Sequence, residues 1–80
     1  MEKKRKHISV TELKTGQKAR VVAIQGGWGF QRKLENIGIR VGSEISNLSG
    51  GENGPVVVRS GCTQVALGRG MARKIIVEQQ

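Results

Sequence analysis

The sequence has few residues that carry catalytic or redox chemistry. Its 80 residues include one cysteine, one histidine and no aspartate. A lone cysteine, Cys62, excludes an internal disulfide, and Cys62 with His7 supplies too few strong ligands for a structural zinc site. A nucleophilic Cys62 would also need a nearby base, which His7 in a basic terminal segment does not offer. We therefore expect no enzymatic activity, no catalytic residue, no resident metal ion and no cofactor.

Long apolar runs are missing as well. No stretch of about 18 apolar residues and no signal-peptide pattern occurs, so we expect a soluble cytoplasmic chain without membrane insertion. Eighty residues are enough for one domain with a small core. We expect this domain over residues 8–80, after a flexible basic tail over residues 1–7.

Positive charge is abundant. Fourteen Lys and Arg residues stand against six acidic residues, which gives a net charge of +8. Such a balance suits nucleic acid, an anionic membrane surface or an acidic protein, and composition does not choose among them. A small barrel that binds RNA or DNA is therefore an alternative function, although two aromatic residues are few for base stacking. Nucleic-acid binding by a basic tail would be non-specific and sensitive to salt.

A short helix is predicted between two strand-like segments. Phe30, Leu34 and Ile37 have the i, i+4, i+7 spacing of one helical face. Gly38 stands where a helix ends in the left-handed conformation, and Ile39 follows at the position of the Schellman hydrophobic contact. The glycines that precede the helix lack the Gly-Lys-Ser/Thr end of a phosphate-binding loop, so we do not expect nucleotide binding.

The remaining segments indicate about five short strands and hence a mainly β fold. Glycine turns between the strands favour a closed or nearly closed antiparallel barrel, with an open α+β sheet as the alternative. In the first strand, Val21 and Ile24 can both face inward only if a bulge lies between them. We predict strands over 19–24, 44–48, 56–60, 63–67 and 74–78, with a mobile loop over 49–55. The expected core is Leu13, Val21, Ile24, Leu34, Ile37, Ile39, Ile45, Val57, Val65, Leu67, Ala72, Ile75 and Val77.

One turn pattern occurs twice. Residues 39–45 repeat the order of residue types in residues 13–19, at an offset of 26 residues. Each copy places a glycine, Gly16 or Gly42, just before a predicted strand. We interpret the repeat as one turn chemistry used twice, because two short copies are too few for a solenoid.

The start of the helix holds the candidate binding residues. Trp28 could fix the helix against the barrel, or stand exposed as the anchor of an interface. Phe30 belongs to the same segment. Arg32 and Lys33 lie on the side away from Leu34, where they could be an ordinary solvated face or attract an acidic partner.

The sequence resembles the FeoA domain family, named for ferrous iron transport protein A. The resemblance covers residues 8 to 78. We expect structural roles for the glycines that belong to it or flank the helix, namely Gly26, Gly27, Gly38, Gly42 and Gly61. The matching residues are Leu13, Gly16, Gly26, Gly27, Leu34, Ile37, Gly38, Ile39, Gly42, Glu44, Ile45, Gly54, Pro55, Gly61, the stretch 65–72, Ile75 and Val77.

This resemblance implies an SH3-like β-barrel without enzymatic activity. It also implies a role beside FeoB, the membrane ferrous-iron permease with a cytoplasmic G-protein domain. Trp28, Phe30, Arg32 and Lys33 are the expected contact residues. The same domain also occurs at the end of the chain of iron-dependent repressors, but this sequence contains no winged-helix segment. A regulatory domain that binds a transition metal ion weakly remains an alternative.

Overall fold

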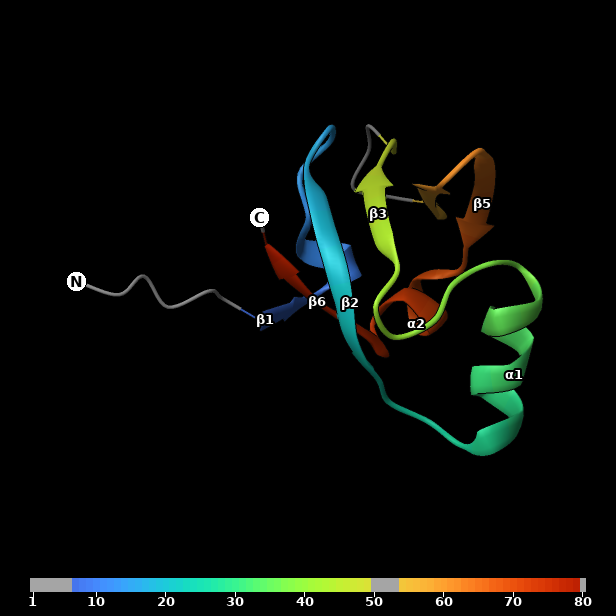
Figure 1. Ribbon diagram of the computed structural model, residues 1–80. Helices are drawn as coiled ribbons and strands as arrows, with labels where there is room; N and C mark the ends of the chain where they lie inside the picture. The colour runs from blue at the N-terminus through green and yellow to red at the C-terminus, as the bar shows by residue number, and fades with distance from the viewer. Residues whose placement is uncertain (1–6, 50–53, 80) are drawn as a thin grey trace.

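A computed structural model describes residues 7–49 and 54–79 of the chain. This part of the chain is mainly β, with a short helix inserted between two strands, as the sequence predicted (Figure 1). The elements are β1 (His7–Ser9), the 3₁₀ helix η1 (Val10–Glu12), β2 (Lys18–Ile24), α1 (Trp28–Asn36), β3 (Glu44–Asn47), β4 (Val56–Ser60), β5 (Thr63–Leu67), α2 (Arg69–Ala72) and β6 (Ile75–Gln79).

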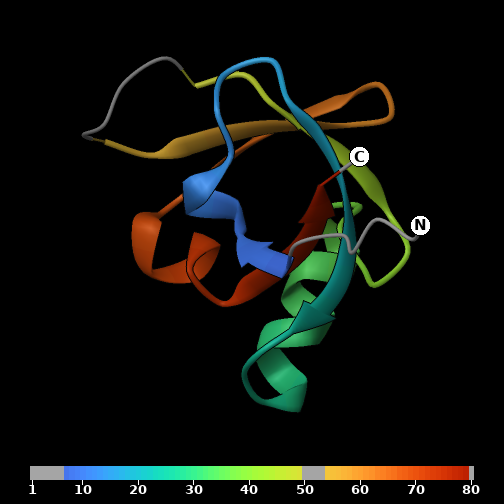
Figure 2. The same ribbon diagram turned by 90° about the vertical axis from the view of Figure 1, so that its left-hand side faces the viewer.

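All the described strands belong to one sheet. Its order is β1-β6-β2-β3-β4-β5, and every neighbouring pair is antiparallel. The sheet curls around its buried face (Figures 1 and 2). Helix α1 lies at the opposite end of the molecule from the start of β2 and the end of β3 (Figure 1). β1 and β5 are the two ends of the strand order, so the sheet has two edges within the described residues.

The structure has one strand more than the sequence predicted. In β1, His7 pairs with Glu78 and Ile8 pairs with Val77. His7, which we expected in the flexible tail, therefore lies in the sheet. A strand of three residues is too short for its alternation to be recognised. The rest of the predicted tail, and positions 50–53 of the predicted mobile loop, lie outside the described residues.

β2 contains the bulge that Val21 and Ile24 need if both are to face the core. Val21 pairs with Val77 but Ala23 pairs with Ile76, so the register shifts by one residue between them. The shift changes which side chains face the core. Val21 is buried, and Ile24 packs against the core although it is only partly covered.

The buried core is close to the predicted one, with differences where the strand pattern is ambiguous. Val57 was assigned to the wrong face: in β4 its neighbours Val56 and Val58 are buried while Val57 is half-buried. A run of three valines gives no alternation from which to choose the face. Ile24, Ile37 and Val65 are only partly buried, and the prediction missed Ile8, Val10 and Ala19. The correctly predicted core residues are Leu13, Val21, Leu34, Ile39, Ile45, Leu67, Ala72, Ile75 and Val77.

Helix α1 ends in the predicted Schellman motif. Gly38 has a φ of +92°. Its N–H donates to the Glu35 carbonyl at 3.0 Å, and the Ile39 N–H donates to the Leu34 carbonyl at 2.9 Å. These two bonds define the motif, and Leu34 and Ile39 are both fully buried in the core. The end of α1 is thus fixed by backbone conformation and by apolar packing together.

The repeated turn is also confirmed. Gly16 has a φ of +86° and Gly42 a φ of +98°. The Gly16 N–H donates to the Asn47 carbonyl at 2.7 Å, and the Gly42 N–H donates to the Val21 carbonyl at 2.8 Å. Each turn therefore docks on the partner strand of the antiparallel β2–β3 pair, and the pair is nearly two-fold symmetric.

Asn47 is the buried polar residue of the described chain, with 4% of its surface exposed. Its Nδ2 donates to the Leu13 carbonyl at 2.6 Å, and its Oδ1 accepts the Ser49 N–H at 2.9 Å. The Ser49 hydroxyl donates to the same Oδ1, and the Thr15 hydroxyl donates to the Ser49 carbonyl. Asn47 therefore joins the turn before β2 to the exit of β3.

We predict that Gly38→Val lowers the free energy of unfolding by about 1 kcal/mol or more, because a β-branched residue is strained at positive φ. Urea denaturation measures the effect. Gly29→Val in the first turn of α1 is the matched control, since Gly29 is not among the glycines of positive φ and has open space around its Cβ position. Equal urea midpoints for Gly38→Val and the parent would contradict the assigned role of Gly38.

We predict that Asn47→Leu lowers the free energy of unfolding by about 2 kcal/mol, because the buried Leu13 carbonyl loses its donor. Asn36→Leu, at the exposed end of α1, is the control and should change stability by less than about 0.5 kcal/mol. Thermal and urea denaturation would both register the difference. A stable Asn47→Leu variant would mean that the amide is not needed to join the two segments.

Candidate functional site

The start of α1 is set by a tight approach between a glycine and an aromatic ring. Gly26 has a φ of +136°, and a Cβ built there would lie 2.9 Å from Phe30 Cδ2. Gly27 is the N-cap, and its carbonyl accepts the N–H groups of Phe30 and Gln31, both at 3.1 Å. Gly27 itself has an extended backbone and no close neighbour, so nothing around it requires a glycine.

Phe30 is the residue that attaches the start of α1 to the sheet. It is partly buried and packs against the core. The Lys74 ammonium lies 5.2 Å from the centre of its ring, within the range of a cation–π contact. The Gln25 N–H donates to the Lys74 carbonyl at 2.7 Å, which holds the preceding loop beside the start of β6.

Trp28 stands in solvent. It is 74% exposed, so it does not fix the helix against the barrel, which was one of its two predicted roles. The Arg32 guanidinium lies over the indole ring, 5.8 Å from the ring centre and one turn further along α1. This contact leaves the rest of the indole face available while limiting its motion.

One cation, Arg32, contacts the exposed indole, and a second, Lys33, follows it on α1. Arg32 and Lys33 are both exposed, and neither the first turn of α1 nor the adjoining loop carries an acidic residue. We call the four residues Trp28, Phe30, Arg32 and Lys33 the Trp28 surface. Trp28 and Arg32 are in contact, Phe30 lies deeper, and Lys33 lies on the same helix without a contact to the indole. Sequence reasoning missed Lys74, because its position beside Phe30 depends on the sheet register.

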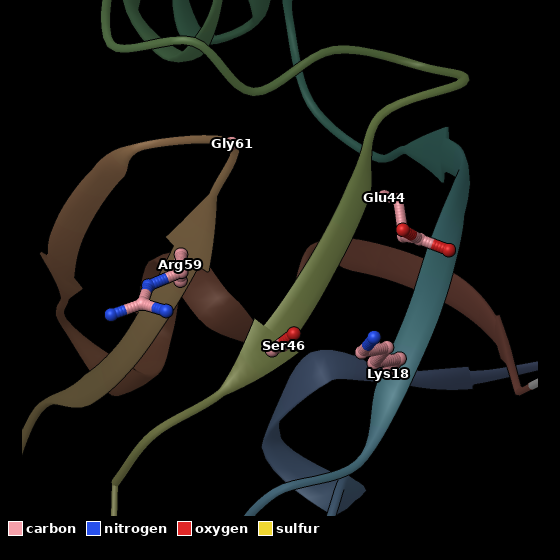
Figure 3. A pocket seen from close by; sticks show the side chains of 5 residues that line it. All are labelled: Lys18, Glu44, Ser46, Arg59 and Gly61. Carbon is pink, nitrogen blue, oxygen red and sulfur yellow. The ribbon is translucent and has the colours of Figure 1, made fainter.

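A second feature lies on the outer face of the sheet. A shallow open hollow of about 230 Å³ is lined by Lys18, Glu44, Ser46, Arg59 and Gly61 (Figure 3). Lys18, Ser46 and Arg59 stand opposite one another on β2, β3 and β4, so a small hydroxyl separates two long cationic side chains. The Glu44 side chain extends over β2, away from Arg59 (Figure 3). In the sequence, the alternation of side chains along each strand predicts only that these residues face outward. It does not predict the register between the strands, which brings them together.

The residues with metal-binding or nucleophilic chemistry lie apart from both features. Cys62 is exposed in the β4–β5 turn, while His7 Nε2 lies 3.6 Å from the Glu78 carboxylate at the other edge of the sheet. Residues 7–49 and 54–79 contain no group of three or more His, Cys, Asp or Glu side chains that could hold a metal ion. No helix within this part of the chain is long and apolar enough to cross a bilayer.

Comparison with known proteins identifies relatives over nearly the whole chain. The sequence model of the FeoA domain matches residues 8–79. A protein of Methanocaldococcus jannaschii, whose name proposes it as an Fe(2+) transport protein A, is 37% identical over 65 residues, which are 81% of this chain and 78% of that protein.

Two solved structures have the same fold. A crystal structure of an iron uptake regulatory protein, FeoA, has a TM-score of 0.87 at 29% identity, over 94% of this chain and all of the other. FeoA from Stenotrophomonas maltophilia, crystallised with zinc and described as an SH3 domain protein, has a TM-score of 0.76 at 25% identity, over 88% of each chain. The expected SH3-like architecture is confirmed, and the chain belongs to the FeoA domain family.

Proposed function

We propose that this chain is a non-enzymatic accessory protein of ferrous iron transport, which acts on the cytoplasmic side by binding the membrane permease FeoB through the Trp28 surface. The observation that carries the proposal is the 74% exposure of Trp28 at the head of α1. A large aromatic side chain in water is unfavourable in the isolated protein and becomes favourable when a partner covers it. Family membership and the names of the relatives give the process in which that partner would act.

The surroundings of Trp28 support an interface with an acidic rim. Arg32 and Lys33 are exposed and follow Trp28 by four and five residues along α1, and the described chain gives neither of them an acidic partner. Cations at the rim of an interface chiefly accelerate association, whereas a buried aromatic anchor slows dissociation. The two kinds of residue should therefore have separable effects on binding kinetics.

The first test is Trp28→Ala. We predict that its affinity for the cytoplasmic part of FeoB falls about thirtyfold, which corresponds to a hot-spot loss of about 2 kcal/mol. Surface plasmon resonance with immobilised FeoB fragment measures the change. Because Trp28 is 74% exposed, the unfolding free energy should change by no more than about 1 kcal/mol.

Val41→Ala is the matched control for Trp28→Ala. Val41 is also an exposed apolar residue, at 58%, but it lies in the turn before β3. Its truncation should leave FeoB binding unchanged. A folded Trp28→Ala variant that binds FeoB as well as the parent would contradict the Trp28 surface. Loss of binding in both variants would point to a broader apolar contact.

The double variant Arg32→Glu with Lys33→Glu tests the rim. It should reduce the association rate severalfold at low salt, with a smaller effect near physiological salt, while the dissociation rate changes little. Lys14→Glu with Lys18→Glu changes the net charge equally on a distant part of the surface and is the control. Equal slowing in both double variants would show that net charge, rather than the position of these cations, controls association.

A further inference from the structure

The outer edge of β5 has no strand beside it in the described chain. Ser60 and Thr63 close the β4–β5 hairpin around a two-residue turn that begins at Gly61, whose φ is +62°. Hydrogen-bonded and non-hydrogen-bonded pairs alternate away from such a turn. Gln64 and Ala66 therefore direct their N–H and C=O groups away from β4, and no backbone bond from a described turn, loop or cap reaches them.

This edge lacks the features that usually protect an edge strand. Natural edges carry charged residues, proline or bulges, or are very short, because an open edge can pair with another chain. The five residues of β5 include no charge and no proline, and their pairing with β4 has a regular register. The opposite edge strand, β1, has only three residues and carries His7, whose ring lies 3.6 Å from Glu78. β5 is thus the edge open to strand addition.

The side chains beside β5 define what an added strand should carry. On the outer face Gln64 lies opposite Arg59, and Ser46 and Lys18 follow on the next strands (Figure 3). Within the described chain, neither Lys18 nor Arg59 has a hydrogen bond or an ion pair. On the inner face Val65 remains partly exposed at the edge. An added strand with acidic side chains outward and apolar side chains inward would match both faces.

Charge also distinguishes between a second copy of this chain and a different protein. Residues 54–77, which contain β4, β5 and α2, have no acidic residue. Their charged residues are Arg59, Arg69, Arg73 and Lys74. Two copies paired through β5 would bring two wholly basic segments close to each other, and segments of the same charge repel. An acidic segment of another protein avoids this repulsion.

We propose that the free edge of β5 binds an extended acidic segment of a partner protein, which adds to the sheet as a further strand. Backbone bonds at Gln64 and Ala66 hold the added strand, and Arg59 selects acidic side chains. This site is separate from the Trp28 surface, so the proposal stands whether or not Trp28 contacts FeoB.

The test uses the full chain labelled with ¹⁵N and an end-capped hexapeptide that alternates glutamate with valine. Its lysine–valine counterpart is the matched probe. At saturating glutamate peptide, amide exchange at Gln64 and Ala66 should slow at least about tenfold, because each amide gains a hydrogen bond. The lysine peptide should leave both amides unchanged. Protection by both peptides alike, or shifts confined to β1 or α1, would overturn the proposal.

Two substitutions at one position separate backbone pairing from general attraction. Ala66→Pro removes an N–H that β4 does not use, so the edge strand should tolerate it while peptide binding is lost. Ala66→Glu keeps the N–H and places a carboxylate beside the acidic peptide, which should weaken binding about tenfold. Undiminished peptide binding by a folded Ala66→Pro variant, or by Ala66→Glu if the proline variant does not fold, would overturn the proposal.

Arg59→Gln tests the selection of charge. It should weaken binding of the glutamate peptide severalfold at low salt. Arg20→Gln is the control, because it removes the same charge from β2, which is three strands away from β5 in the sheet order. This variant should bind the glutamate peptide like the parent. Equal losses in both variants would overturn the role of Arg59. A concentration-dependent dimer in sedimentation, with β5 amides protected without peptide, would identify a second copy as the occupant and overturn the choice of an acidic partner.

Discussion

The buried amide of Asn47 is the interaction on which the arrangement of the sheet depends. It accepts hydrogen bonds from Ser49 and donates one to Leu13, so a single side chain joins two segments more than thirty residues apart. If the Asn47 amide were removed, the Leu13 carbonyl would stay buried without a hydrogen-bond donor. A buried polar group without a partner lowers the free energy of unfolding, because it has lost its contact with water and gained nothing in exchange. The turn before β2 and the exit of β3 are therefore coupled, and the register between these strands follows from that coupling.

At both ends of the β2–β3 pair, a turn glycine donates a backbone hydrogen bond to the opposite strand, but the two ends differ in one respect. Gly16 and Gly42 each bond to the strand opposite, at Asn47 and Val21. One symmetry-related position is thus polar and the other apolar. Val21 only fills the core, whereas Asn47 also fixes the exit of its strand through Ser49. The near two-fold symmetry of the β2–β3 pair explains why the sequence pattern occurs twice. The symmetry is broken at Asn47, whose side chain also binds the segment that follows β3.

Local chemistry made much of the fold predictable, whereas the sites depend on register. The end of α1, the bulge in β2 and the repeated turn were predictable because glycine conformation and side-chain alternation act over a few residues. Val57 was not, since a run of valines has no preferred face. The exposure of Trp28 could not be decided either, because it depends on whether any other part of the chain reaches α1. Lys18, Ser46 and Arg59 come together only once three strands are aligned, which sequence periods alone do not provide.

The way α1 is attached has a consequence for its motion. Leu34 is its only fully buried side chain within the described structure, and Phe30 adds a partly buried contact at the other end. Because so few of its side chains are buried, opening of this helix alone should cost less free energy than unfolding of the sheet. Whatever binds this helix would then select its docked orientation from several, and would lose affinity in proportion to the time the helix spends detached. The tightness of such a complex would be governed partly by Leu34, a residue that no partner touches.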